Sequence, residues 1–277
     1  MNIFNTLKRF SLSAKLSVLF LILLVFMVTF LPNLEIFNYN KPTGKALESP
    51  SKAHILGTDD LGIDLFSQLI YGGRISLFVG LLTAIIAGIG GSLIGIISGY
   101  FEGYIDKIFM RLADIFLILP ELPTMIVLGA FFGPSMKNII FVLSIFTWTK
   151  TARIIRSKVL SIKEDKYIKM AKAYGGGFLY ITFKHFLPKI FPIIMISFIK
   201  LINRAIIFEA SLSFLGLGDP TSKSWGLILN YALNFEGIYF TPYWKWWLVS
   251  PLVSIILVVV SISLIVREFE SIYKIKV

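Results

Sequence analysis

Three stretches of this chain run for about 20 residues or more without a charged side chain. They cover residues 16–34, 75–101 and 246–266. A helix rises about 1.5 Å per residue and the hydrocarbon core of a bilayer is about 30 Å thick, so stretches of this length predict membrane-spanning helices. We expect the first to remain uncleaved, because it is longer than the apolar part of a signal peptide and no Ala-x-Ala site follows it.

The composition supports the same interpretation. Apolar residues make up 56% of the 277 and charged residues 16%, whereas soluble domains carry about 45–50% and about 25%. This composition excludes a soluble enzyme and a disordered tail. The absence of cysteine excludes a secreted disulfide scaffold. Residues 112–133, 137–149 and 190–210 are also largely apolar. The prediction is an all-α integral membrane protein with about six transmembrane helices.

Lysine and arginine predict the orientation, because they are retained in the cytoplasmic loops. With six spans, one side of the membrane holds residues 1–15, 102–111, 150–189 and 267–277. That side carries 18 of the 27 Lys and Arg residues, and the opposite loops carry 7. Both termini are therefore expected to be cytoplasmic. The net charge of +11 reflects this topology, and no nucleic-acid partner is expected.

Small residues recur every fourth position in the second span. Gly80, Ala84, Gly88 and Ser92 form one stripe, and a second stripe consists of Ala87, Gly91, Gly95 and Gly99. Such stripes let helix backbones approach closely in lipid. We favour packing inside the bundle over a dimer seam.

Several charged residues fall inside predicted spans, where charges usually face a bundle interior or a wet cavity. Asp114 and Glu121, seven residues apart, would share a face of one helix, and Lys200 and Arg204 are likewise spaced for one face. Glu209 lies off that second face. Either they line a path for a polar substrate, or they lie near the headgroups.

The predicted cytoplasmic stretch 150–189 holds a short amphipathic helix. Ser161 and Glu164 have the spacing of a capping box. Beyond them Tyr167, Met170 and Tyr174 recur at helical spacing, and three glycines from Gly175 end the helix. Such a helix could lie on anionic lipid or dock into a protein groove, and its residues alone leave both open.

Nucleotide, metal and hydrolase motifs are incomplete. Gly57 and Gly62 have phosphate-loop spacing, but Ile63-Asp64 follows where Lys-Ser/Thr is required. His54 lies near several aspartates, yet with two histidines and no cysteine we expect no metal site. A Gly-x-Ser-x-Gly elbow is absent, so no catalytic residues and no cofactor of its own are expected.

Three separated motifs nevertheless resemble one family. Residues 209–218 (EASLSFLGLG), followed by Ser224-Trp-Gly226, and residues 54–64 (HILGTDDLGID) are similar to the second permease subunit of ATP-binding-cassette importers for dipeptides, oligopeptides and nickel. The cytoplasmic stretch resembles that family's ATPase-contacting motif, Glu-Ala-Ala, three residues, Gly, nine residues, Ile-x-Leu-Pro. Lys169 and Met170 replace its Glu and Ala, and His185 replaces its Ile.

The resemblance implies that residues 167–177 form a coupling helix that docks on a cytoplasmic ATPase subunit. The residues at this contact would be Tyr167, Lys169, Met170, Ala171, Ala173, Gly175, Leu187 and Pro188. It also implies four kinds of partner: a second permease in a heterodimer, two ATPase subunits that use ATP, an extracytoplasmic substrate-binding protein, and membrane lipid. Asp114, Glu121, Arg204 and Glu209 are the candidates for the substrate path.

The domain organisation follows from these expectations. Residues 1–15 are a cytoplasmic N-terminus, 16–34 the first transmembrane helix, 35–74 an extracytoplasmic segment, 75–266 the permease domain, and 267–277 a cytoplasmic C-terminus. The permease domain includes the coupling loop 150–189 and an outer segment, 211–245. Trp244, Trp246 and Trp247 are expected in an outer interfacial belt.

The predicted function is import of di- and oligopeptides through a path of which this chain forms half. Nickel or another small solute is the alternative within the family. An ion-coupled secondary transporter, with Asp114 and Glu121 as its ion site and no ATPase, is the alternative from another class.

Overall fold

The computed structural model describes residues 10–33 and 39–273, and within these ranges it is helical and contains no β-strand. The long helices are α2 (Leu12–Phe30), α3 (Leu65–Phe101), α4 (Gly103–Ile118), α5 (Glu121–Phe132), α6 (Met136–Lys163), α9 (Leu187–Leu212) and α12 (Val249–Tyr273). The short elements are η1 (Leu31–Asn33), α7 (Lys166–Ala173), α8 (Phe178–Ile181), η2 (Thr182–Phe186), η3 (Ser213–Leu217), α10 (Trp225–Asn234) and α11 (Trp244–Trp247). The all-α class is confirmed.

Five helical stretches of the described chain are long and apolar enough to cross a membrane, and a bent pair of helices would make a sixth. The five are α2, α3, α6, the continuous stretch Phe178–Leu217 and the stretch Trp244–Tyr273. Two helices extend beyond the predicted spans. α3 begins at Leu65 instead of residue 75, and α6 continues to Lys163 instead of ending at residue 149.

The bent pair is α4 and α5, which meet at 93°. Residues 112–133 therefore do not form one continuous helix, and the pair counts toward the six spans only as a broken span. Leu119 and Pro120 are extended between the two helices. Proline has no backbone N–H and disfavours helical conformation in the residue before it, so helix α4 ends there.

α3 is the central helix, and its main packing partners are α6 and α9. A Cβ atom added at Gly91 or Gly95 would lie 2.6 Å from a backbone carbonyl oxygen of α6, and one at Gly80 would lie 2.7 Å from Ile206 of α9. The two small-residue stripes thus contact two different helices of the same chain. The preference for internal packing is confirmed.

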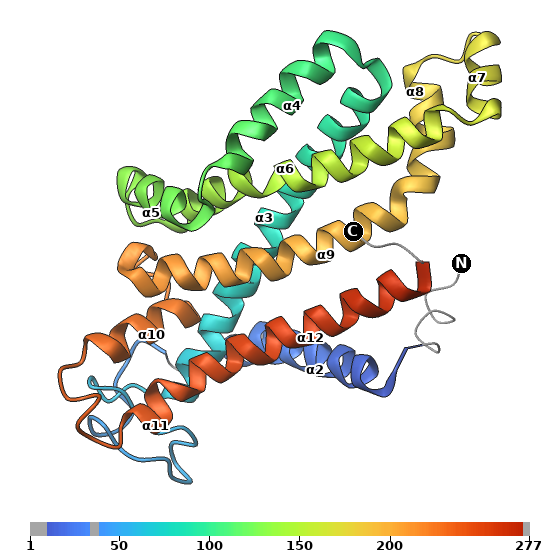
Figure 1. Ribbon diagram of the computed structural model, residues 1–277. Helices are drawn as coiled ribbons and strands as arrows, with labels where there is room; N and C mark the ends of the chain where they lie inside the picture. The colour runs from blue at the N-terminus through green and yellow to red at the C-terminus, as the bar shows by residue number, and fades with distance from the viewer. Residues whose placement is uncertain (1–9, 34–38, 274–277) are drawn as a thin grey trace.

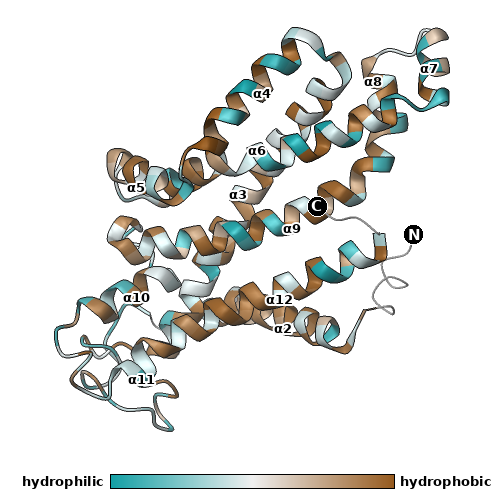
Figure 2. Ribbon diagram, in the orientation of Figure 1, coloured by the Kyte–Doolittle hydropathy of each residue, from teal (hydrophilic) through white to brown (hydrophobic). Residues whose placement is uncertain are grey.

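The two ends of the bundle carry different elements. Figure 1 shows α7 and α8 at one end, where α2 begins and α12 ends, and α5, α10 and α11 at the other. Phe10 and Phe269 make an edge-to-face contact with ring centroids 5.4 Å apart, which fixes the start of α2 beside the end of α12. Apolar residues follow α2 and α12 over most of their length, whereas α7 is mixed (Figure 2).

Candidate functional site

α7 is attached to the bundle through one buried side chain. Ile168 is fully buried in a cluster with Ile162, Ile181 and Phe186, which come from α6, α8 and η2. Asp165, the residue before α7, accepts a hydrogen bond of 3.0 Å from the Lys189 ammonium, and this bond lowers the pKa of the Asp165 carboxyl. The predicted capping box is wrong, because Ser161 lies inside α6, which continues to Lys163.

A glycine turn ends α7. The Gly176 N–H donates to the Ala171 carbonyl at 2.9 Å and the Gly175 N–H to the Lys172 carbonyl at 3.0 Å, the two bonds of a Schellman motif. Gly175 has φ of +84°, a conformation that residues with a Cβ rarely adopt. The predicted glycine stop is confirmed, and its backbone geometry sets where the chain goes next.

The surface of this end is unusually apolar and aromatic. We call its exposed large side chains the coupling surface: Tyr167, Met170, Tyr174, Leu179, Tyr180 and Phe183. Tyr174 is 86% exposed. Exposed apolar groups gathered in one place are typical of a contact with another protein or with the membrane.

The residues aligned with the ATPase-contacting motif lie around this surface. Lys169 is exposed and its ammonium lies 2.6 Å from a Glu164 oxygen. His185, which replaces an isoleucine, lies between the rings of Tyr167 and Tyr180, at centroid distances of 5.5 and 5.6 Å. Of the remaining motif residues, Ala173 and Pro188 are exposed, and Ala171 and Leu187 are partly buried. Leu187 packs on the Ile168 cluster and begins α9.

A second feature is a row of ion pairs between α4–α5 and the antiparallel helix α6, which we call the charge ladder. Its rungs are Glu102–Lys163 at 2.6 Å, Asp106–Arg156 at 2.6 Å, Asp114–Arg153, and Glu121–Lys150 at 3.5 Å. The first three rungs each join one carboxylate to one cation. The ladder follows α6 from the end near α7 well into the span.

The last rung has a third member. Arg204 of α9 is paired with the same Glu121 carboxylate that Lys150 contacts, and its guanidinium lies over the Phe208 ring, 5.3 Å from the centroid. Asp114 and Glu121 do not share a helix face, because the α4–α5 bend separates them. That prediction is wrong, although both residues belong to the ladder.

The other predicted path residue, Glu209, lies apart from the ladder. It is 1% exposed, and its carboxylate accepts hydrogen bonds from Ser213 at 2.7 Å and Ser76 at 2.9 Å. It therefore ties the end of α9 to α3. Lys200, on the same helix, is paired with Glu270 of α12 at 2.6 Å.

The end of the bundle opposite α7, beside α10 and α11, is a folded loop region. Asp59 is buried and accepts hydrogen bonds from the Gln68 amide at 2.7 Å and the Ile63 N–H at 2.8 Å. Beside it is a polar cavity of about 550 Å³ that Lys223 and Trp247 also line, and burial lowers the pKa of the Lys223 ammonium.

The tryptophan belt is only partly present. Trp244 is partly exposed, but Trp246 and Trp247 are buried in the core between α3, α10 and α12. Two of the three therefore do not face a membrane interface, and that prediction is wrong for them.

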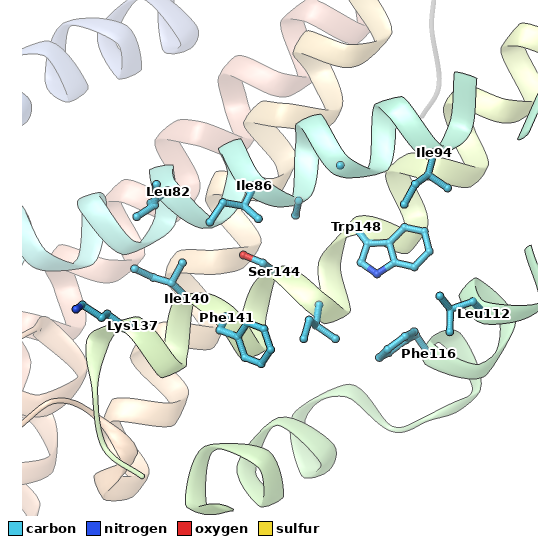
Figure 3. A pocket seen from close by; sticks show the side chains of 13 residues that line it. Leu82, Ile86, Ile94, Leu112, Phe116, Lys137, Ile140, Phe141, Ser144 and Trp148 are labelled. Atoms are coloured by element: carbon cyan, nitrogen blue, oxygen red, sulfur yellow. The ribbon is translucent and has the colours of Figure 1, made fainter. Parts of the chain in front are cut away.

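An apolar groove of about 690 Å³ lies between α3, α4 and α6 (Figure 3). Ile86 and Ile94 of α3 face Phe116 of α4 and Trp148 of α6 across it, and Lys137 lies at one end. No cluster of three His, Asp or Glu side chains able to hold a metal occurs in the part of the chain that the structure describes.

Three site residues escaped the sequence reasoning, namely Lys150, Arg153 and Arg156. The sequence pattern places them in a cytoplasmic loop, because the apolar run ends at residue 149. The available signal was the absence of Gly and Pro from 136 to 163, which permits one long helix, together with the i, i+3 spacing of the three cations.

Comparison with known proteins identifies the family. Residues 91–271 match the family model described as binding-protein-dependent transport system inner membrane component. The chain is 37% identical over 223 residues to the glutathione transport system permease protein GsiD of Pectobacterium atrosepticum, covering 80% of this chain and 74% of that protein. It is 33% identical over 240 residues to the oligopeptide transport system permease protein OppC of Bacillus subtilis, covering 86% and 77%.

A third relative is the dipeptide transport system permease protein DppC of Alkalihalophilus pseudofirmus, 36% identical over 220 residues, which cover 79% of this chain and 71% of that protein. The family match spans α4 to α12, and so includes the charge ladder and the coupling surface. The chain is a member of the family of binding-protein-dependent transport system inner membrane components.

Proposed function

We propose that this chain is the second permease subunit of an ATP-binding-cassette importer for di- and oligopeptides, and that it forms half of the transmembrane path. The observation that carries the substrate class is that three relatives at 33–37% identity are named for glutathione, dipeptide and oligopeptide transport. As a transport component the chain acts without catalysis of its own, and ATP is hydrolysed by separate ATPase subunits.

The coupling surface is the proposed contact with an ATPase subunit. Its apolar side chains are exposed at the α7 end of the bundle, and α7 is fixed to α6, α8 and η2 by Ile168. Exposed rings at Tyr167 and Tyr174 suit a lipid surface as well as a protein groove, and the similarity of residues 169–188 to the ATPase-contacting motif is what favours the protein groove. Closure of two ATPases around ATP would then move α7 and the spans attached to it.

Asp114, Glu121 and Arg204 are the proposed lining of the substrate path. All three take part in ion pairs, and their side chains remain between 23% and 38% exposed. Charges that are this deep in a span and still exposed are expected to face a water-filled cavity. Glu209 is left out of the proposed path, because it is 1% exposed and its carboxylate is bound by Ser76 and Ser213.

The proposed assembly contains a second permease subunit as a heterodimer partner, two ATPases, a substrate-binding protein on the outer loops, and surrounding lipid, with no nucleic acid. The polar outer cavity at Asp59 and Lys223 supports a protein contact there. Family membership favours this assembly over an ion-coupled transporter that works alone.

Uptake in cells tests the function directly. The chain, co-expressed with its permease partner, ATPases and binding protein in a peptide-uptake-deficient host, should accumulate a labelled dipeptide in an ATP-dependent way. An ATPase-inactive complex is the control. Accumulation of nickel but not peptide, or peptide uptake that persists without ATPase activity, would refute the proposal.

The orientation is tested separately. We propose that both termini are cytoplasmic, because the start of α2 and the end of α12 lie at the α7 end of the bundle (Figure 1) and because Lys and Arg concentrate there. A reporter that is active only in the cytoplasm should be active when fused after residue 277. Activity of a reporter that functions only outside the cell would contradict this topology.

A further inference from the structure

Among the four carboxylates of the charge ladder, only that of Glu121 is paired with two cations. In the other three rungs one acid matches one base. At Glu121 the Lys150 ammonium lies 3.5 Å from one carboxylate oxygen, and Arg204 is paired with the other. The group formed by Lys150, Arg204 and Glu121, which we call the triad, therefore carries a net charge of +1.

The triad lies along the part of α6 that is expected to cross the membrane. Lys150 is 14 positions beyond Met136, the outer end of α6, which corresponds to about 21 Å of helix in a hydrocarbon layer about 30 Å thick. An unmatched charge at such depth is costly unless it faces water or an opposite charge. Glu209 does not supply that charge, because its carboxylate is bound by Ser76 and Ser213.

The unmatched cation is also accessible. The Lys150 side chain is 52% exposed, compared with 27% for Arg204 and 23% for Glu121. Arg204 is held by Glu121 and by its contact with Phe208, so its position is constrained from two sides. Lys150 has the longer ion-pair distance and the freer ammonium group, and is the member of the triad able to turn towards a ligand.

From this charge count and exposure we infer that the triad is a carboxylate-binding site, and that Lys150 binds the C-terminal carboxylate of a peptide as it passes through the membrane. This inference rests on the proposed peptide substrate. Every linear peptide with a free C-terminus carries this group whatever its side chains, so a site for it would serve peptides of different sequence.

The test compares a peptide with its C-terminal amide, which lacks the negative charge. Complete transporters are reconstituted in vesicles with binding protein already loaded with trialanine or trialanine amide. The wild-type complex should transport the acid more efficiently than the amide. Lys150→Gln should lower the efficiency for the acid about tenfold and leave the amide nearly unchanged, while Lys150→Arg should retain most of the preference.

Lys137→Gln is the matched control, because Lys137 is an exposed lysine at the outer end of the same helix and belongs to none of the rungs. It should leave the ratio of acid to amide unchanged. Equal losses for acid and amide in Lys150→Gln would show a structural role only and overturn the inference. Failure of the wild-type complex to transport either peptide would instead refute the proposed function.

If the binding protein does not bind trialanine amide, the transport comparison cannot be made, and a second measurement is used instead. The purified complex without binding protein is heated with trialanine, its amide, or sodium chloride at equal ionic strength. Of the three additives, only trialanine should raise the melting temperature of the complex, by preferential binding to the folded state. Lys150→Gln should abolish that rise. Equal stabilisation by chloride, or an undiminished rise in Lys150→Gln, would overturn the inference.

Discussion

Gly175→Val should uncouple the protein from its ATPase partner while leaving it folded in the membrane. Gly175 has φ of +84°, and a β-branched residue there is strained by about 1–3 kcal/mol. We expect the turn after α7 to open and the coupling surface to lose its shape. A loss of about 2 kcal/mol weakens ATPase binding roughly 30-fold, so co-purification of the ATPases and peptide uptake should both collapse.

The loop offers its own controls for this variant. Gly177 also has open space around the position of a Cβ atom, but its φ is −75°, so Gly177→Val should retain ATPase binding. Gly175→Asn should retain much of it as well, because asparagine tolerates positive φ. Co-purification of Gly175→Val with a full complement of ATPases would show that this turn is not needed for coupling.

Gly95→Val should prevent correct packing of the bundle itself. A Cβ atom at Gly95 would lie 2.6 Å from the Ala152 carbonyl oxygen and 2.9 Å from the Ile155 Cβ, and a backbone carbonyl cannot move aside as a side-chain end can. Overpacking of this kind costs about 1–3 kcal/mol or more. We expect a clear fall in the melting temperature of the purified protein and in the amount that accumulates in the membrane.

The matched control is Gly90→Val on the same helix. No atom lies within 4 Å of a Cβ added at Gly90, which borders the apolar groove. This variant should accumulate and melt like the wild type. If the two variants were equally stable, close approach of α3 and α6 at Gly95 would not be what holds the pair together.

Much of the bundle could be predicted because lipid simplifies the problem. A span requires a long apolar stretch, and close helix contacts require small residues, so α2, α3 and α12 and the packing face of α3 follow from local patterns. The glycine stop after α7 follows in the same way, because left-handed backbone strongly favours glycine. These features depend on short stretches of chain and on the solvent.

The charge ladder could not be predicted in the same way, because it depends on which helices are neighbours. Asp114 and Glu121 stand out in the sequence, but their partners Arg153 and Lys150 become visible only once α6 is placed antiparallel to α4. Assigning those cations to a loop concealed the pairing. Trp246 and Trp247 illustrate the same limit, since only tertiary packing decides whether an aromatic residue faces lipid or core.

The bend at Pro120 lies between these two cases. Proline in an apolar segment indicates a break, yet its angle and the new direction of α5 depend on what α5 meets. Here the first residue of α5, Glu121, is held by Lys150 and Arg204. The bend and the triad are thus one arrangement, and a change in either would alter the other.

The stretch from Phe178 to Leu217 runs without a gap through α8, η2, α9 and η3. Its 40 residues correspond to about 60 Å at the rise of an α-helix, enough to reach from the coupling surface to the loops at the opposite end of the bundle. Mechanically it can act as a lever. The end far from α7 is bound to α3 where Glu209 meets Ser76, so a small displacement near α7 would exert a torque on that bound end. Such a lever would bend at the π-helical turn Thr182–Phe186 and at Pro192. Stiffening these positions is predicted to change how far the end of the bundle opposite α7 moves.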